Sequence, residues 1–104
     1  MRRGEVWWAN LTAPAGPRPV LLLSRDEAYP RRRSVTIAPI TTRFRDIPVE
    51  VRLGPEDGLP KLSVVNLDDI TTIRMSTLDR QIAMLSPQKM DAVNSAIRFA
   101  LDLD

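Results

Sequence analysis

The chain has 104 residues, 43% of them hydrophobic and 27% charged, and this length and balance predict one compact domain over residues 1–104. It contains no cysteine and no histidine, which excludes disulfides, thiolate nucleophiles, ordinary zinc enzymes and hydrolases that use a histidine base. Any catalysis must therefore use arginine, carboxylate and hydroxyl groups, or a metal held by oxygen ligands.

Charge is distributed unevenly along the chain. Residues 1–45 carry nine arginines and three acids, a net charge of +6, whereas residues 46–104 carry six cations and ten acids, a net charge of −4. Thirteen of the fifteen cations are arginines, and the planar guanidinium fork suits phosphates and base edges. The basic half therefore favours an anionic partner, nucleic acid first, with a merely solvated basic face as the alternative.

No segment is typical of a membrane span or an export signal. The apolar run Pro19–Leu23 is far shorter than the roughly 18 residues that span a bilayer. The first residues lead into Trp7 and Trp8 and not into the apolar core of a signal peptide. We expect a cytoplasmic protein with no membrane partner.

Short strands separated by turns are predicted along most of the chain, because apolar, β-branched and aromatic runs alternate with segments rich in proline and glycine. The predicted strands are Glu5–Asn10, Pro19–Ser24, Ser34–Ile40, Ile47–Leu53, Leu62–Leu67, Ile70–Ile73 and Gln81–Leu85. The main loops are expected over Thr12–Pro17, over Asp26–Arg33 with one helical turn, and over Gly54–Pro60. This spacing is typical of a small barrel or a tightly curved sheet.

A helix is predicted after the last strand. Ser86 is a suitable N-cap and Pro87 fits the first helical position. The apolar positions that follow at spacings of three or four are Met90, Val93, Ile97 and Leu101. They predict an amphipathic helix of about four turns, whose apolar face packs on the core, with an interface as the alternative.

Two segments place polar side chains at the ends of predicted strands. Arg18 lies between Pro17 and Pro19, which stiffen the backbone just before a buried strand. Thr41 follows the third predicted strand directly. Taken alone, Arg18 could equally be an ordinary surface residue and Thr41 an ordinary turn residue, with no role in function.

Six segments in chain order carry a family resemblance: Arg3–Trp8, Arg18–Leu23, Val35–Thr41, Gly58–Val65, Asp69–Ile73 and Leu85–Ser86. They extend over nearly the whole chain and resemble the MazF/PemK-like toxin endoribonucleases of bacterial toxin–antitoxin pairs. The resemblance implies a mainly β (α+β) fold, a small SH3-like curved barrel with a C-terminal helix of the CcdB/MazF type. It also implies a homodimer, cleavage of single-stranded RNA with no metal or cofactor, a cognate antitoxin, and an operator DNA complex formed through that antitoxin.

By position in these segments, the resemblance implies that Arg18 is the catalytic arginine and Thr41 the catalytic hydroxyl residue. Asp68, next to Asp69, stands where the family has an acidic residue in its RNA-binding groove. The first loop, Thr12–Pro17, is shorter and richer in proline than in many members. Because that loop contacts RNA in the family, the cleavage sequence stays open.

The composition suits this chemistry independently of the family. RNA carries its own nucleophile, the 2′-hydroxyl, which attacks the adjacent phosphate and releases a 5′-hydroxyl. An arginine fork stabilises the extra negative charge of the transition state, and Thr41 holds a phosphate oxygen or the 2′-hydroxyl. Arg18 stays protonated and is unsuited as the base, which leaves Asp68 or a water molecule.

Further RNA contacts are predicted around these residues. On a strand, Trp7 and Trp8 point to opposite faces, so one is core and the other stacks on a base or covers a dimer interface; burial of both is the alternative. The cluster Arg31–Arg33 is a solvated loop, or it steers RNA or an acidic antitoxin segment. The predicted RNA-binding residues are Trp8, Arg43, Arg45, Asp68 and Asp69.

Two other classes of function remain open. A CcdB-like toxin of the same fold would poison DNA gyrase without cutting RNA. An SH3-like module would bind nucleic acid or a peptide in a salt-sensitive way, again without cleavage. Discrete fragments from a long RNA incubated in EDTA would separate the ribonuclease from both.

Overall fold

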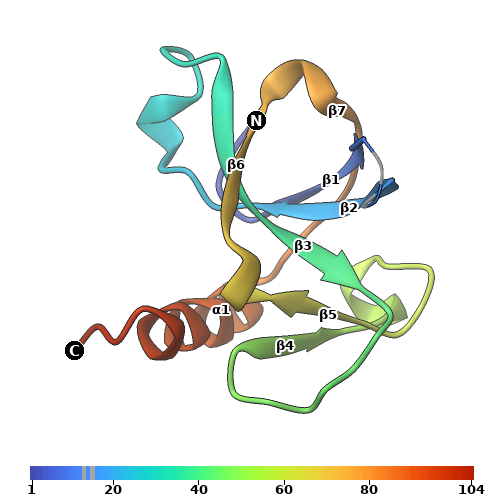
Figure 1. Cartoon of the computed structure of the whole chain (residues 1–104), viewed down its shortest axis with the longest axis vertical. Coiled ribbons are helices and arrows are strands. Elements are labelled where there is room, and N and C mark those ends of the chain that lie inside the picture. Colours follow the sequence, from blue (N-terminus) through green and yellow to red (C-terminus); the bar gives the residue numbers. More distant parts are fainter. Residues whose placement is uncertain (13, 15) are drawn as a thin grey trace.

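The computed structural model of the chain describes residues 1–12, 14 and 16–104. The predicted loop Thr12–Pro17 includes Ala13 and Ala15, which lie outside the described residues. In the described part, seven strands precede one helix (Figure 1). These elements are β1 (Glu5–Asn10), β2 (Pro17–Leu22), β3 (Ser34–Thr41), β4 (Glu50–Leu53), β5 (Ser63–Asn66), β6 (Thr71–Arg74), β7 (Leu78–Met84) and α1 (Pro87–Ala100).

The strands form one antiparallel sheet in the order β4-β5-β3-β2-β1-β7, and β6 pairs with β3 outside this path. One edge of β3 pairs with β2, while the other edge pairs first with β6 and then with β5. This change of partner curls the sheet (Figure 1). Among the described residues, the end strands β4 and β7 do not pair with each other. The predicted mainly β fold with a terminal helix is confirmed, and the curl is that of a barrel that does not close.

Both faces of the central strands are buried. Leu21 and Ala38 belong to the core that α1 covers, and Val20 and Ile37 belong to a second core on the opposite face. Successive residues of a strand point to opposite faces. A continuous apolar run such as Val20–Leu23 is therefore required here, because each of its neighbours enters a different core.

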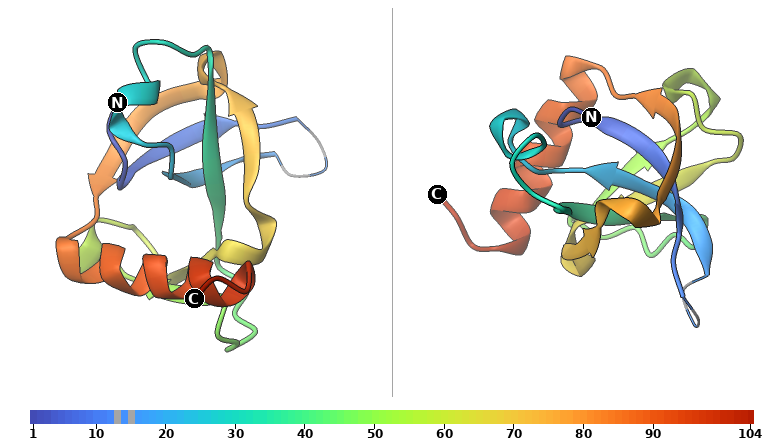
Figure 2. Two further views of the ribbon diagram at one scale, coloured as in Figure 1. Left: turned by 90° about the vertical axis from the view of Figure 1, so that its left-hand side faces the viewer. Right: turned by 90° about the horizontal axis from the view of Figure 1, so that it is seen from above.

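The helix α1 begins where the sequence predicts. The Ser86 hydroxyl accepts a hydrogen bond of 3.2 Å from the backbone N–H three residues on, and Pro87 is the first helical residue. Val93 and Ala96 are buried in the first core, and the helix lies across one end of the curled sheet (Figure 2). The prediction that Leu101 continues the apolar face is wrong. That side chain is 56% exposed, and Leu101 is the residue that caps the C-terminal end of α1.

The observed β2 begins and ends two residues before the predicted strand Pro19–Ser24. Its first residues pair with β1 alone, so Pro17, which has no N–H to donate, is tolerated there. At the other end, the Ser24 hydroxyl accepts the hydrogen bond of the Thr36 N–H at 2.9 Å and replaces a backbone carbonyl. The other predicted strands begin and end within three residues of the observed ones. No helix in the described residues is long and apolar enough to cross a bilayer.

Candidate active site

Three adjoining hollows lie where β2 begins and β3 ends. The central hollow, of about 650 Å³, is lined by Arg18, Pro39, Thr41, Arg43, Phe44, Arg45, Glu50, Asn66 and Asp69. The aspartate hollow is lined by Leu11, Arg18, Ile37, Pro39, Asp68, Asp69, Ile70 and Thr71. The tryptophan hollow is lined by Trp8, Pro19, Ile40, Thr41, Thr42, Leu59, Pro60, Lys61 and Ser63.

Shared residues join these hollows into one surface, called here the candidate groove. Arg18 and Asp69 line both the central and the aspartate hollow, and Thr41 lines both the central and the tryptophan hollow. All seven residues predicted for catalysis and RNA contact line the groove. Five of them meet in the central hollow, while Asp68 and Trp8 lie in the hollows on either side.

Arg18 and Thr41 come together through the pairing of β2 with β3. The last β2–β3 pair is Val20 with Pro39, and two residues beyond it on each strand, Arg18 and Thr41 line the same central hollow. Residues two apart on a strand face the same way, so both side chains lie on the face that buries Val20. Both are half-buried. Two residues that are distant in sequence thus become neighbours at the ends of two rigid strands.

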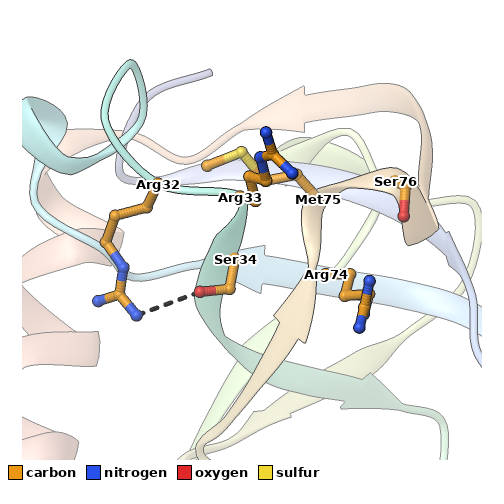
Figure 3. Close-up of a pocket in the computed structure, with 6 residues that line it drawn as sticks. All are labelled: Arg32, Arg33, Ser34, Arg74, Met75 and Ser76. Atoms are coloured by element: carbon orange, nitrogen blue, oxygen red, sulfur yellow. Dashed lines mark hydrogen bonds between the residues drawn. The ribbon is translucent and has the colours of Figure 1, made fainter.

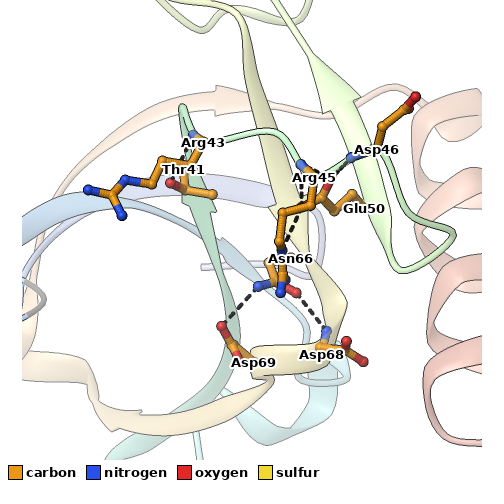
Figure 4. Close-up of polar contacts among 8 residues, drawn as sticks. All are labelled: Thr41, Arg43, Arg45, Asp46, Glu50, Asn66, Asp68 and Asp69. Carbon is orange, nitrogen blue, oxygen red and sulfur yellow. Dashed lines mark hydrogen bonds and ion pairs between the residues drawn. The ribbon is translucent and has the colours of Figure 1, made fainter.

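The Thr41 hydroxyl is oriented by the chain that follows β3. Its oxygen accepts a hydrogen bond from the backbone N–H of Arg43 at 3.2 Å (Figure 4). A hydroxyl has one proton to donate and two lone pairs that accept. Since this contact uses a lone pair, the Thr41 proton stays available to an oxygen in the central hollow.

Glu50 anchors the loop that carries Arg43 and Arg45. Its carboxylate accepts hydrogen bonds from the backbone N–H groups of Arg45 at 3.0 Å and Asp46 at 2.9 Å, and the Arg45 Nε lies 3.4 Å from it (Figure 4). The Glu50 side chain is 3% exposed. Burial raises the pKa of Glu50, but these hydrogen bonds outweigh burial and hold the pKa below its ordinary value. Glu50 is therefore ionised and unsuited to accept a proton near neutral pH.

Asn66 orients Asp68 and Asp69 in a similar way, through two side-chain hydrogen bonds. Its side-chain oxygen accepts a hydrogen bond from the Asp68 N–H at 2.9 Å and caps the short helical turn Leu67–Asp69. Its side-chain nitrogen donates to Asp69 Oδ2, also at 2.9 Å. Asn66 is 6% exposed, so this contact fixes the direction of the Asp69 carboxylate.

Three polar or aromatic residues of the central hollow, Phe44, Glu50 and Asn66, were not predicted from the sequence. Asn66 precedes Asp68 at the spacing of an Asx turn, a signal that was available. Phe44, whose ring is 42% exposed, stands between two arginines, which is the interleaving of basic and aromatic residues typical of nucleic-acid surfaces. Glu50 gave no local signal, because its role depends on burial and on backbone groups several residues away.

The two neighbouring tryptophans have different surroundings. Trp7 packs against the second core and donates its indole N–H to the Glu5 carboxylate at 2.8 Å. Trp8 lines the tryptophan hollow and is half-buried. The Arg80 guanidinium lies 5.7 Å from the centre of its ring, within the range of a cation–π contact. Of the two, Trp8 is the ring that a ligand in the groove can reach.

The groove thus combines three guanidinium groups, a hydroxyl with a proton to donate and two exposed carboxylates at the ends of rigid strands. Guanidinium groups bind phosphate oxygens by paired hydrogen bonds, and groups on strand ends are held in set positions. Fold and groove together define a class of protein, a small curved-sheet protein with an arginine-lined groove suited to a polyanionic chain.

Comparison with known proteins identifies the family within this class. A family model described as PemK-like, MazF-like toxin of type II toxin–antitoxin system matches residues 2–101. The Mycobacterium tuberculosis protein named "Probable endoribonuclease MazF5" is 42% identical over 101 residues, covering 96% of this chain and 92% of that protein. The endoribonuclease MazF of Staphylococcus saprophyticus is 32% identical, covering 99% of this chain and 92% of that protein.

Solved structures agree with the sequence comparison. The Mycobacterium tuberculosis toxin MazF-mt6 matches with a TM-score of 0.89 at 39% identity, covering 96% of this chain and 98% of that one. An endoribonuclease in complex with its cognate antitoxin, from a mycobacterial species, matches with a TM-score of 0.89 at 30% identity, covering 100% and 97%. The chain belongs to the PemK-like, MazF-like toxins of type II toxin–antitoxin systems and is a toxin endoribonuclease. The resemblance predicted from the sequence is confirmed, and neither alternative is favoured.

Proposed function

We propose that this toxin cuts single-stranded RNA at short sequences without a metal, through attack by the substrate's own 2′-hydroxyl, with Arg18 and Thr41 as the catalytic residues. The observation that carries the proposal is that Arg18, at the start of β2, and Thr41, at the end of β3, line the same central hollow. A guanidinium fork beside a hydroxyl donor is the combination that a phosphate with growing negative charge requires.

In the proposed step, the 2′-oxygen forms a bond to the adjacent phosphorus as the bond from phosphorus to the 5′-oxygen breaks. The Arg18 fork binds the non-bridging oxygens, whose charge grows in the transition state, and the Thr41 hydroxyl donates a hydrogen bond to one of them. The leaving 5′-oxygen takes a proton from a water molecule and becomes a 5′-hydroxyl, and the other fragment ends in a 2′,3′-cyclic phosphate. Asp69, which shares the central hollow with Arg18, is better placed than Asp68 to accept the 2′ proton.

The other lining residues hold the RNA on either side of the cut. Arg43 and Arg45 contact phosphates, because their loop is fixed by Glu50 at the mouth of the central hollow. Trp8 stacks on a base that enters the tryptophan hollow, an interaction that contributes about 1–3 kcal/mol per base in other proteins. Asp68 contacts the RNA from the aspartate hollow.

The chain is expected to work as a cytoplasmic homodimer that a cognate antitoxin neutralises and, through it, joins to operator DNA. Support comes from the solved relative bound to its antitoxin and from apolar side chains exposed on and after α1, where Phe99 is 57% and Leu101 56% exposed. Light scattering at tens of micromolar tests the dimer. A mass near 11.7 kDa, that of one chain, would contradict it.

The decisive experiment uses a long RNA incubated with the protein in EDTA, followed by mapping of the fragment ends. We expect discrete cuts with 5′-hydroxyl and 2′,3′-cyclic or 3′-phosphate ends. Replacing the 2′-hydroxyl at one mapped site by hydrogen should abolish that cut and leave binding nearly unchanged, because phosphate contacts supply most of the affinity. Products with a 5′-phosphate, or cutting of the deoxy-substituted site, would require an activated water and would contradict the mechanism.

A further inference from the structure

A second basic surface lies at the opposite end of β3 from the candidate groove. A hollow of about 640 Å³, called here the arginine hollow, is lined by Arg32, Arg33, Ser34, Arg74, Met75 and Ser76 (Figure 3). Ser34 begins β3 and Thr41 ends it. At roughly 3.3 Å per residue of extended strand, about 23 Å separate this hollow from the groove.

The pairing of β3 with β6 builds the arginine hollow on a rigid base. Ser34 pairs with Arg74 in the β3–β6 register. Just beyond this pair, the Met75 N–H donates to the Arg33 carbonyl at 2.9 Å. The Arg32 guanidinium donates to the Ser34 hydroxyl at 3.1 Å. The backbone positions of Arg33 and Arg74 are therefore set by strand ends, whereas Arg32 lies in the preceding loop, where its N–H donates to the backbone carbonyl four residues earlier at 3.0 Å.

The charges of this hollow are not balanced by nearby acids. Arg32, Arg33 and Arg74 are exposed, and in the part of the chain that the structure describes none of them forms an ion pair with a carboxylate. No carboxylate lines the arginine hollow, whereas Glu50 and Asp69 lie among the arginines of the groove. Neighbouring like charges repel one another, and an anionic ligand would relieve that repulsion.

We propose that the arginine hollow is a second phosphate-binding site for RNA, which holds the backbone of the substrate beyond the segment that is cut. The proposal rests on the proposed function, because it extends the RNA contact made in the groove. Figure 3 shows Arg32 and Arg74 on opposite sides of Ser34. Guanidinium groups spread in this way fit separate phosphates of one strand better than a single small anion.

The residues that line the arginine hollow are better suited to bind RNA than an acidic peptide. A peptide partner gains most of its affinity from apolar or aromatic anchors in well-packed pockets. The arginine hollow offers one apolar side chain, Met75, beside two serine hydroxyls that can contact phosphate oxygens. The exposed apolar side chains on and after α1, such as Phe99, are the surface better suited to a protein partner.

The test compares the double variant R33Q/R74Q with R2Q/R98Q, which removes the same charge from exposed arginines outside the arginine hollow. Binding is measured with single-stranded 2′-O-methyl RNA, which has no free 2′-hydroxyl to attack, at lengths of about five and about twenty nucleotides. R33Q/R74Q should weaken binding of the longer RNA roughly fivefold and reduce the salt slope by about 0.7 per lost phosphate contact. The shorter RNA should bind as before. In cleavage, KM for long RNA should rise while kcat stays constant.

Three results would overturn this assignment: equal loss on both lengths, a loss no larger than in R2Q/R98Q, or weaker antitoxin binding with unchanged binding of long RNA. The last result would assign the hollow to a protein partner. Failure of the proposed cleavage mechanism can be distinguished from failure of the second RNA-binding site. If the wild-type protein cut no RNA and yet long-RNA binding depended on Arg33 and Arg74, the second site would stand without the cleavage mechanism.

Discussion

The two ends of β3 carry arginines in opposite surroundings. At the C-terminal end, the Glu50 carboxylate holds the backbone and side chain of Arg45, and Asn66 holds Asp69 beside Arg18. At the N-terminal end, Arg33 and Arg74 have no carboxylate between them. Acids among arginines lower the net charge but fix positions, as a reaction requires. Arginines without acids attract a polyanion and need no exact geometry.

The largest difference between the two ends should be in the chemical step. R18A is expected to lower the single-turnover rate on a short RNA by about 10²–10³, the usual cost of removing a preorganised donor to developing charge. R18K should rescue little, because lysine keeps the charge without the planar fork. R33A, at the other end of β3, should change this rate by less than about twofold. Similar losses in R18A and R33A would remove the distinction.

Loss of the hydroxyl at the C-terminal end of β3 should also lower the cleavage rate, whereas loss of the hydroxyl at the N-terminal end should leave it unchanged. T41A is expected to lower the rate roughly 10–100-fold, the value of a hydrogen bond to a charged oxygen, and T41S should retain most of the activity. S34A removes the hydroxyl that begins β3 and should leave the rate on short RNA unchanged. A fully active T41A would refute a catalytic role for this hydroxyl.

Glu50 should matter for stability more than for chemistry. E50Q replaces the ionised acceptor of the Arg45 and Asp46 N–H groups by a neutral amide oxygen and should lower the free energy of unfolding by about 1 kcal/mol, measured with urea. E27Q, which changes an exposed carboxylate, is the matched control and should have little effect. If E50Q were as stable as E27Q, the loop that carries Arg43 and Arg45 would not depend on this anchor.

The pH dependence of stability follows from the same carboxylate. The folded-state pKa of Glu50 lies below the ordinary value of 4.5, so the unfolded chain binds a proton more readily than the folded one. The contribution of Glu50 is therefore complete above about pH 4.5 and is lost as the pH falls through the folded-state pKa. Urea titrations from neutral to acid pH should show that the free energy of unfolding falls less steeply with decreasing pH in E50Q than in the wild-type protein. Parallel curves would contradict the assignment.

The smallest expected effect is the difference in cleavage rate between two variants that each lose a helix cap, one in the groove and one at the start of α1. N66A and S86A each remove a side-chain cap and should each cost about 1 kcal/mol of stability. Only N66A should also lower the cleavage rate, because Asn66 directs the Asp69 carboxylate whereas Ser86 caps α1. Equal rates in the two variants would show that the direction of Asp69 does not affect the reaction.

Local patterns in the sequence predicted the strands well and the end of the helix poorly. Runs bounded by proline and glycine became strands, and the alternation of a strand placed Trp7 in the second core and Trp8 in the groove. Leu101 keeps the helical spacing, but the helix ends at Ala100 and the Leu101 side chain is 56% exposed. Periodicity describes the face of a helix and carries no information on where its partner surface stops.

The sequence by itself determined the chemical inventory of this toxin: an arginine-rich half, no histidine or cysteine, and Arg18 and Thr41 at strand ends. The tertiary structure decided which of these groups meet. Arg18 and Thr41 share a hollow only because β2 and β3 pair in one register, and a slip of one residue would turn one side chain to the other face. Glu50 and Asn66 bond to groups only two to five residues away. The burial of their side chains, which holds these contacts in place, arises only when the sheet curls.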